Sequence, residues 1–260
     1  MGKMFVPERR RVILNRLNES QRVSIKELAK EIQVSEATLR TDLTKMEEEG
    51  LLKRTHGGAV LADSSDNETS FSIREKKNKI EKSAIAKEAA AMLENGQCIM
   101  LDASSTALEL ARILKDKPIR LTVVTSGINT ALELNEHPDI TVILLGGIVK
   151  RGSHSLEGTL GVNILNQINI DLLFTSANGF SLESGLTDFS VYEVELKKAM
   201  VRASKKVIAL LDHSKFFKNS IASFASLGDI DIIITDSSQA NSQKHVLAEH
   251  GVELITIETE

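Results

Sequence analysis

Hydroxyl, amide and carboxylate side chains recur at the ends of short apolar segments between residues 97 and 260. Several of these clusters lead directly into a segment with helical periodicity, whose first N–H groups lack intrahelical partners and attract anions. Hydroxyls, glycines, helix N-termini and a lysine together predict a site for a phosphorylated polyol. The candidate groups are Asp102, Ser104, Ser105, Thr106, Thr125, Ser126, Gly146, Gly147, Asn178, Glu193 and Lys215.

Each of these groups also has a plainer interpretation. A Ser or Thr before a helix commonly serves as its N-cap, and Lys215 taken alone is typical of a solvated charge. Glu193 and Glu195 fit the solvated start of a helix, where carboxylates interact favourably with the helix dipole. The recurrence of such groups after successive segments, and no single one of them, favours the ligand site.

Other kinds of site are not indicated by the spacing of residues. The six histidines are scattered, and a single cysteine cannot supply a zinc motif; they are His56, His137, His154, His213, His245 and His250. Cys98 lies in the apolar run QCIML, which is typical of a buried core thiol. Residues 146–152 do not form the GxGxxG pattern of a dinucleotide site. We therefore expect no metal ion and no cofactor.

The elements that must position the candidate site alternate along the chain. Segments with helical periodicity separate most of seven apolar, β-rich segments, which are QCIMLD, IRLTVVT, ITVILLGG, DLLFTSA, KVIALLD, DIIITD and VELITI. Such an alternation predicts a mostly parallel sheet covered on both faces. Ligands of these sheets bind beyond the carboxyl ends of the strands, where the candidate groups lie. We expect a Rossmann-like α/β domain.

A second organising stretch, residues 24–46, predicts two short helices joined by a turn at residues 33–34. Ser24 and Glu27 have the spacing of a capping box at the start of the first helix. Ser35 offers an N-cap hydroxyl for the second helix. This arrangement is typical of a helix-turn-helix.

The second helix of this pair has two distinct faces. Leu39, Leu43 and Met46 recur at i, i+4 and i+7, so they are expected to pack against the first helix. The opposite face carries short polar side chains and two cations, which suit a DNA major groove. The predicted DNA-contacting residues are Ser35, Glu36, Thr38, Arg40, Thr41 and Lys45, with Arg54 and His56 from the segment that follows. An ordinary helical hairpin with a solvated face fits this stretch equally well.

The flanking segments favour DNA binding over the plain hairpin. Pro7 is expected at the first position of a basic helix with Ile13 and Leu17 on its buried face. Its arginines are expected to face solvent or phosphates, and they are Arg9, Arg10, Arg11 and Arg16. Gly50 is expected to end the recognition helix, and residues 51–60 predict a two-stranded ribbon with Gly57 and Gly58 as its turn. Three helices and a basic ribbon predict a winged helix-turn-helix.

Charge divides the chain in the way that DNA binding requires. Residues 1–60 carry a net charge of +3, whereas the whole chain carries −4, and attraction to DNA requires a basic surface. No apolar run approaches the roughly 18 residues of a membrane-spanning helix, and the N-terminus has no apolar segment resembling a signal peptide. The single cysteine fits a reducing compartment. We expect a cytoplasmic protein with no membrane partner.

The composition of residues 61–70, LADSSDNETS, is typical of a linker. A charged run then leads into a helix that we expect over residues 82–94, with Ile85 and Ala89 on its apolar face. The expected division is therefore a DNA-binding domain over residues 1–60, a linker over residues 61–80 and a sensor domain over residues 81–260.

Several of these segments carry a resemblance to a known family. VSIKELAKEIQVSEATLRTDL and LLKRTHGGAV resemble the N-terminal domain of the DeoR family of bacterial transcriptional regulators. DASST, VTS, GG at 146, GLT at 185 and DHSKF resemble elements of its sensor domain. The resemblance covers nearly the entire chain. It implies a winged helix-turn-helix followed by a ribose-phosphate-isomerase-like sensor domain, which binds a phosphorylated sugar and releases the DNA.

The sequence departs from the family pattern at positions that bear on specificity. Thr41 stands where the family usually has a second Arg in the recognition helix, which implies an altered operator preference. The other departures fall in the expected pocket and bear on which sugar fits; they are Ala103, Ser104, Ser126, Ser176 and His213.

The alternative to a regulator is a sugar-phosphate isomerase-like enzyme with an accessory DNA-binding module. Such an isomerase needs a base and a lysine that stabilises the enediolate charge, and only Glu193, Glu195 and Lys215 are candidates. The G-A-D-E-x-D loop of the isomerases appears as SANGFS over residues 176–181, without its carboxylates. We therefore expect no catalytic residue.

The sequence thus predicts a transcriptional regulator that binds double-stranded operator DNA and responds to a phosphorylated sugar. We expect it to repress genes of sugar or polyol metabolism, although activation needs the same two parts. Because two recognition helices must meet two half-sites about one helical turn apart, we expect a homodimer or a homotetramer.

Overall fold

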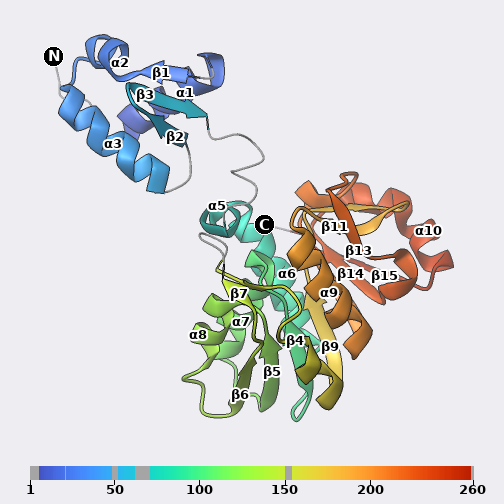
Figure 1. The fold of residues 1–260 in the computed structure, drawn as a ribbon. Coiled ribbons are helices and arrows are strands. Elements are labelled where there is room, and N and C mark those ends of the chain that lie inside the picture. The colour runs from blue at the N-terminus through green and yellow to red at the C-terminus, as the bar shows by residue number, and fades with distance from the viewer. Residues whose placement is uncertain (1–5, 21, 49–51, 62–70, 150–153, 259–260) are drawn as a thin grey trace. The chain divides into compact units, whose positions relative to one another are not determined.

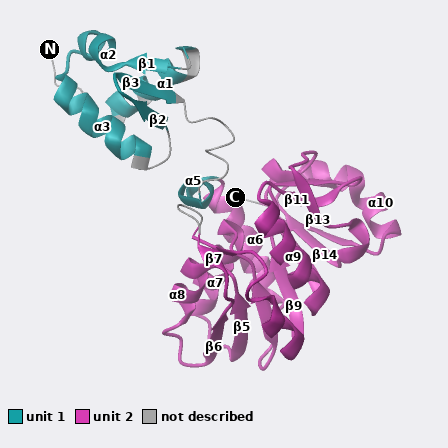
Figure 2. Cartoon of the chain, in the orientation of Figure 1, with its two compact units in different colours: residues 1–77 teal, residues 78–260 magenta. Residues whose placement is uncertain are grey.

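The computed structural model describes residues 6–20, 22–48, 52–61, 71–149 and 154–258 (Figure 1). The chain forms two compact units, Met1–Lys77 and Asn78–Glu260 (Figure 2). Among the described helices, none has both the length and the apolar composition needed to cross a bilayer.

The first unit contains three helices and a small sheet. The first helix, α1 (Val6–Ser20), begins one residue before Pro7. It is followed by β1 (Arg22–Ser24), α2 (Ile25–Glu31), α3 (Glu36–Glu48), β2 (Leu52–Thr55) and β3 (Gly58–Leu61). The predicted apolar faces form one core, because Ile13, Leu17, Leu39, Leu43 and Met46 are all fully buried. The winged helix-turn-helix is confirmed.

The ribbon of this unit has three strands, in the order β1-β3-β2, where the sequence predicted two. Gly58 already pairs with Thr55 of β2 and with Ser24 of β1, so the turn is made by His56 and Gly57. A Cβ atom on Gly58 would lie 1.8 Å from the carbonyl oxygen of Val23. Glycine is therefore required at this position by the close approach of β1, and not by the turn itself.

The predicted capping box at Ser24 is wrong. Ser24 belongs to β1, and its side chain makes no capping hydrogen bond to α2. The N–H of Ile25, at the start of that helix, donates instead to the carbonyl oxygen of Gly57, 2.9 Å away. The carbonyl oxygen of Gly57 in the wing thus satisfies one of the free N–H groups at the start of α2. The Ser24 hydroxyl was expected to accept from such a group.

Arg9 does not face solvent as expected. Its Nε donates to Asp42 Oδ2 over 2.7 Å and its Nη2 donates to Asp42 Oδ1 over 3.2 Å. The two side chains are only 10% and 5% exposed, so this bidentate ion pair fastens α1 to the recognition helix α3. Arg16 pairs with Glu31 at the surface, and the side chain of Arg11 lies outside the described part of the structure.

The segment expected to link the two domains is partly helical. Residues 62–70 and Gly50 lie outside the described residues. After them, α5 spans Phe71–Lys76 and α6 spans Lys79–Ala91, three residues ahead of the helix expected at residue 82. Both helices therefore fall at least partly within residues 61–80.

The second unit is built on a seven-stranded sheet of the predicted kind. Its strands run in the order β15-β14-β12-β9-β4-β5-β6, and every neighbouring pair is parallel. All seven apolar segments become strands, which are β4 (Cys98–Leu101), β5 (Leu121–Thr125), β6 (Ile140–Leu144), β9 (Ile170–Thr175), β12 (Ser204–Leu211), β14 (Ile232–Thr235) and β15 (Glu253–Thr256).

Helices cover both faces of this sheet, as expected from its apolar strands. Alternate residues of β4 divide between two cores: Ile99 and Leu101 pack with α6 and α7 (Ser105–Lys115), whereas Met100 packs with α9 (Val191–Ala203). Figure 1 shows α6, α7 and α9 around the sheet. The remaining helices are α8 (Ile128–Leu134), α10 (Lys244–Glu249) and the 3-10 turns η1 (Val162–Gln167), η2 (His213–Lys215), η3 (Leu227–Asp229) and η4 (Ser238–Gln243).

Two small antiparallel arrangements were not predicted. The strands β10 (Gly179–Ser181), β11 (Gly185–Asp188) and β13 (Ala222–Ala225) form a second sheet in the order β10-β11-β13. The two-residue strands β7 (Ile148–Val149) and β8 (Leu156–Glu157) pair with each other. The second sheet is important for the site, because it carries Asp188.

Candidate DNA-reading face and effector site

The start of the recognition helix α3 is organised by Ser35, as predicted. The hydroxyl of Ser35 accepts a hydrogen bond from the N–H of Thr38 over 3.1 Å and lies 2.8 Å from the hydroxyl of Thr38. Substitution of an N-cap of this kind typically costs about 1 kcal/mol. Both hydroxyls are thus used to build the helix end that is predicted to face the major groove.

The outer face of α3 is open to solvent at Glu36, Arg40, Thr41 and Lys45. Arg40 lies 3.5 Å from Glu36, but both side chains are about half exposed. An ion pair of this kind contributes little to stability, so Glu36 holds the guanidinium of Arg40 only weakly. The exposed face therefore has the composition expected of a base-reading surface.

Arg54 is fastened to the recognition helix. Its Nη1 donates to the hydroxyl of Thr44 over 2.7 Å, and its backbone N–H donates to Glu47 Oε1 over 2.7 Å. His56 is exposed at the tip of the ribbon. Arg54 thus joins the wing to α3, a contact that the sequence did not reveal. His56 lies at the tip of the wing, where a contact with a DNA groove or the DNA backbone was expected.

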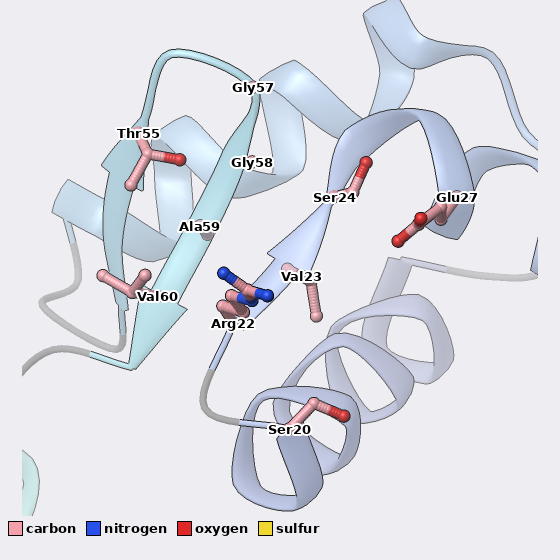
Figure 3. Close-up of a pocket in the computed structure, with 10 residues that line it drawn as sticks. All are labelled: Ser20, Arg22, Val23, Ser24, Glu27, Thr55, Gly57, Gly58, Ala59 and Val60. Atoms are coloured by element: carbon pink, nitrogen blue, oxygen red, sulfur yellow. The ribbon is translucent and has the colours of Figure 1, made fainter.

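A groove of about 770 Å³ lies beside the wing, between β1, β3 and the end of α1 (Figure 3). Its lining includes the charged residues Arg22 and Glu27 and the hydroxyls of Ser20, Ser24 and Thr55. It contains none of the residues predicted to contact DNA. The predicted effector residues belong to the other unit, so this groove is not the expected sugar-phosphate pocket.

In the second unit, the sheet reverses its strand order between β4 and β9. The strands β5 and β6 continue on one side of β4, and β9 and β12 continue on the other. A crevice at such a reversal is where doubly wound sheets bind ligands. Asp102, a predicted site residue, follows β4, and Ser176 follows β9, so these two residues flank the reversal.

Asp102 is the fully buried centre of this region, with 0% of its surface exposed. Its Oδ2 accepts hydrogen bonds from the Thr175 hydroxyl over 2.7 Å and from the Ser176 N–H over 2.9 Å. Its Oδ1 accepts from the Ser104 N–H over 2.9 Å. The carboxylate thereby connects the loops that follow β4 and β9.

A lysine that the sequence analysis missed supplies a positive charge to this centre. Lys197 of α9 is 4% exposed, and its Nζ lies 2.8 Å from Asp188 Oδ2, 3.3 Å from Asp102 Oδ2 and 3.4 Å from Glu193 Oε1. It also donates to the carbonyl oxygen of Ser176 over 2.8 Å. A buried charge with so many partners is typical of a functional or organising centre.

The charges of this cluster stabilise one another. Burial alone would raise the pKa of Asp102, but the ammonium of Lys197 and the hydrogen bonds to the carboxylate outweigh that effect and lower it. Burial likewise opposes the charge of Lys197, yet Asp188, Asp102 and Glu193 raise its pKa. Both groups are therefore ionised at neutral pH.

Glu193 is not the solvated residue that one interpretation expected. It is buried and forms part of the Lys197 cluster, whereas Glu195 is exposed as expected. A signal was present in the sequence, because Glu193 and Lys197 are spaced i, i+4 along the apolar face that also contains Val194, Leu196 and Met200. A charged pair on an apolar face indicates a buried ion pair, since charges are seldom buried unpaired.

The hydroxyls after β4 and β5 lie at neighbouring strand ends. Ser104 caps α7 by accepting a hydrogen bond from the N–H of Ala107 over 3.1 Å, and Ser105 and Thr106 are buried in the first turn. The loops after β4 and β5 touch, since a Cβ atom on Gly127 would lie 3.3 Å from Cα of Ala103. The structure therefore places the loop that carries these hydroxyls against the end of β5, which carries Thr125, its last residue, and Ser126.

The other predicted residues serve recognisable structural roles. The N–H of Asn178, directly before β10, donates to the carbonyl oxygen of Thr187 in β11 over 3.0 Å, which extends the pairing of these two strands. A Cβ atom on Gly147 would lie 2.7 Å from the carbonyl oxygen of Glu157, so packing against β8 accounts for that glycine. Gly146, beside it, is exposed at the end of β6.

Lys215 belongs to a second polar group at the end of β12. Burial would raise the pKa of Asp212, but Lys215 and hydrogen bonds from Ser214 and Asn78 lower it. Asn78 Nδ2 donates to Asp212 Oδ1 over 2.8 Å. The lysine that contacts Asp102 is thus Lys197, and Lys215 lies with the carboxylate of Asp212.

Comparison with known proteins identifies both units. Residues 9–65 match the family described as the DeoR-like helix-turn-helix domain, and residues 77–237 match the DeoR C terminal sensor domain. Among solved structures, ribose 5-phosphate isomerase A from Methanocaldococcus jannaschii matches part of this chain at 18% identity and a TM-score of 0.42, covering 55% of this chain and 56% of that chain.

Several named transcriptional regulators match this chain over almost their full length. The HTH-type transcriptional regulator GolR of Listeria innocua is 48% identical, over 90% of this chain and 92% of its own. The repressor GlcR of Bacillus subtilis is 34% identical, with 98% of each chain covered. The glycerol-3-phosphate regulon repressor of Escherichia coli is 30% identical, with 95% and 97% covered. All three relatives are named as transcriptional regulators or repressors, which supports the regulator prediction over the isomerase alternative, and the chain belongs to the DeoR family of transcriptional regulators.

Proposed function

We propose that this regulator represses genes of sugar or polyol metabolism and that a phosphorylated sugar releases it from its operator. The N-terminus of α7, at the end of β4 beside the reversal of strand order, supports this proposal most strongly. Ser105 and Thr106 are buried in its first turn, close in the chain to Asp102, which pairs with Lys197. Helix N-termini of this kind bind phosphate, and hydroxyls beside them suit a polyol.

The names of relatives point to the same class of genes. One of the relatives above is a glycerol-3-phosphate regulon repressor. Another relative, 30% identical, is named a putative aga operon transcriptional repressor, from Escherichia coli O157:H7. Control of genes for small phosphorylated metabolites would require both a DNA-reading unit and a phosphate-binding unit, and this chain provides a candidate for each.

The mechanism that we propose is a shift between two arrangements of a homodimer or homotetramer. Residues 1–60 read the operator, residues 81–260 bind the effector, and residues 61–80 join them. Bound effector favours an arrangement in which the spacing of the two recognition helices no longer matches the two half-sites. The effector can shift this equilibrium only by as much as it binds one arrangement more tightly than the other.

For the DNA-reading face, Arg40→Ala is expected to weaken specific operator binding by about 1 to 3 kcal/mol, the usual contribution of a bidentate base contact. Fluorescence anisotropy with operator and scrambled DNA measures the change. Arg202→Ala removes the same charge from an exposed position of the other unit and is the matched control. Equal losses for operator and scrambled DNA would show that Arg40 contacts only phosphates.

For the effector site, Ser105→Ala and Lys215→Ala are each expected to leave operator affinity unchanged and to abolish release by the effector. The two variants test the α7 N-terminus and the β12 end separately. Matched controls are Ser242→Ala, at an exposed hydroxyl, and Lys206→Ala, at an exposed lysine near the opposite end of β12. If the effector still releases one of these variants from the operator as it releases wild type, the substituted residue does not belong to the proposed site.

A further inference from the structure

Three side chains that are far apart in the sequence converge beside the end of β12. They are Glu81 in the first turn of α6, His213 in η2 and Asp236 directly after β14. One oxygen or nitrogen atom of each lies within 4.8 Å of the others. The fold explains the convergence, because β12 and β14 are parallel neighbours with Leu211 opposite Thr235, and α6 packs on both strands.

The carboxylate of Asp236 is held in place at this cluster. His213 donates its backbone N–H to Asp236 Oδ1 over 2.7 Å, and its ring Nδ1 lies 2.6 Å from Asp236 Oδ2. The side chain of Asp236 is 5% exposed, whereas that of His213 is 49% exposed. The buried carboxylate is therefore rigid, and solvent has access to the imidazole.

The charge around His213 favours a cation. Glu81 and Asp236 both face the imidazole, and Asp212 precedes it in the chain. Lys82 and Lys215 both act on Asp212. The two carboxylates of Glu81 and Asp236 lie at the imidazole, where they would attract a dication.

From this geometry we propose that Glu81, His213 and Asp236 form a binding site for a divalent transition-metal ion, specifically Zn²⁺. Imidazole and carboxylates are ligands that Zn²⁺ accepts, and it commonly takes three protein ligands while leaving a fourth position open. Zn²⁺ would replace the proton between the ring nitrogen of His213 and the carboxylate of Asp236. The carboxylate of Glu81 would be the third ligand. The sequence predicted no metal because the three ligands lack the short spacing of a zinc motif.

The test is a calorimetric titration of the full chain with Zn²⁺, in buffer free of chelators. Wild type is expected to bind one Zn²⁺ ion per chain at this site. His213→Ala and Glu81→Gln are each expected to weaken binding by at least about 10-fold, the lower end of what even outer-shell changes cost. Circular dichroism spectra that match wild type show that the variants are folded.

His245→Ala is the matched control, because His245 lies 3.3 Å from Glu249 on an exposed helix and has one carboxylate partner where His213 has two. It is expected to bind Zn²⁺ as wild type does. Absorption bands of bound Co²⁺ that disappear in His213→Ala would support imidazole ligation. Absence of Zn²⁺ binding by wild type, wild-type affinity in His213→Ala, or equal affinity for Mg²⁺ would overturn the site. None of these outcomes bears on operator release by a sugar phosphate, which is measured separately.

Discussion

Replacing Lys197 with methionine is expected to destabilise residues 78–260 by about 3 to 5 kcal/mol, because it leaves three buried carboxylates without their cation. Asp102, Asp188 and Glu193 all lie within 3.4 Å of the Lys197 ammonium. Methionine preserves most of the volume of the lysine stem, so the loss of stability measures the effect of the missing charge and not the effect of a cavity. Hydrogen exchange in peptides from β4 and α9 measures the change within this unit.

A compensating variant separates the electrostatic cause from a packing defect. Lys197→Met combined with Asp188→Asn removes one of the uncompensated charges and is expected to recover part of the lost stability. Lys198→Met is the matched control, since Lys198 pairs at the surface with Glu195, and it is expected to cost less than about 1 kcal/mol. Equal effects of Lys197→Met and Lys198→Met would contradict the role assigned to the cluster.

The stability of the Lys197→Met variant is also expected to depend on pH. In wild type the pKa of Asp102 is lowered, so its contribution is fully present above the ordinary pKa near 4 and is lost as the pH falls through the lowered value. Without the ammonium, burial is left to raise the pKa of Asp102, so its carboxylate takes up a proton at a higher pH than in wild type. The free-energy difference between wild type and variant should therefore be smaller at pH 5 than at pH 8.

Replacing Arg9 with methionine is expected to destabilise the DNA-binding unit by about 3 kcal/mol. The change leaves the buried Asp42 carboxylate without its bidentate partner, and such losses are typically about 3 to 5 kcal/mol. The lower end applies because the Arg9 side chain is still 10% exposed. Since Asp42 belongs to α3, the recognition helix is also expected to lose its fixed position, and operator affinity should fall.

The matched control for Arg9 lies on the same helix. Arg16 pairs with Glu31, but both side chains are more than 40% exposed, so Arg16→Met is expected to cost less than about 1 kcal/mol. Hydrogen exchange in peptides from α1 and α3 follows the two variants. If both variants exchange like wild type, the Arg9–Asp42 pair does not hold these helices together.

The elements that the sequence predicted well are those whose signal is local and long. Each of the seven parallel strands is an apolar run bounded by polar residues, and Leu39, Leu43 and Met46 fix the buried face of α3 by their spacing. The strands that were missed, such as β1 (Arg22–Ser24) and β10 (Gly179–Ser181), contain no apolar run of more than two residues. They are defined by the strands that pair with them, and nothing in their own residues identifies that partner.

The charged residues were predicted less well for a related reason. Arg9 looks like any solvated arginine of a basic helix until its partner Asp42, on another helix, is known. Lys197 likewise lies beside Lys198, which is only partly buried, and the burial of Lys197 follows from carboxylates that the fold gathers from the end of β4 and from β11. The hydroxyls before α7 were identified correctly as strand-end groups, because their place depends only on the strand that precedes them.

The most direct test of the central claim is an operator-binding titration of the full chain, followed by fluorescence anisotropy, with and without a panel of phosphorylated sugars and polyols. The matching unphosphorylated compounds serve as controls. The expected result is tight, sequence-specific binding that at least one phosphorylated compound weakens, while its unphosphorylated counterpart has no effect. Specific binding that responds equally to the unphosphorylated compound, or to no member of the panel, would contradict a phosphate-binding site at the carboxyl ends of the strands.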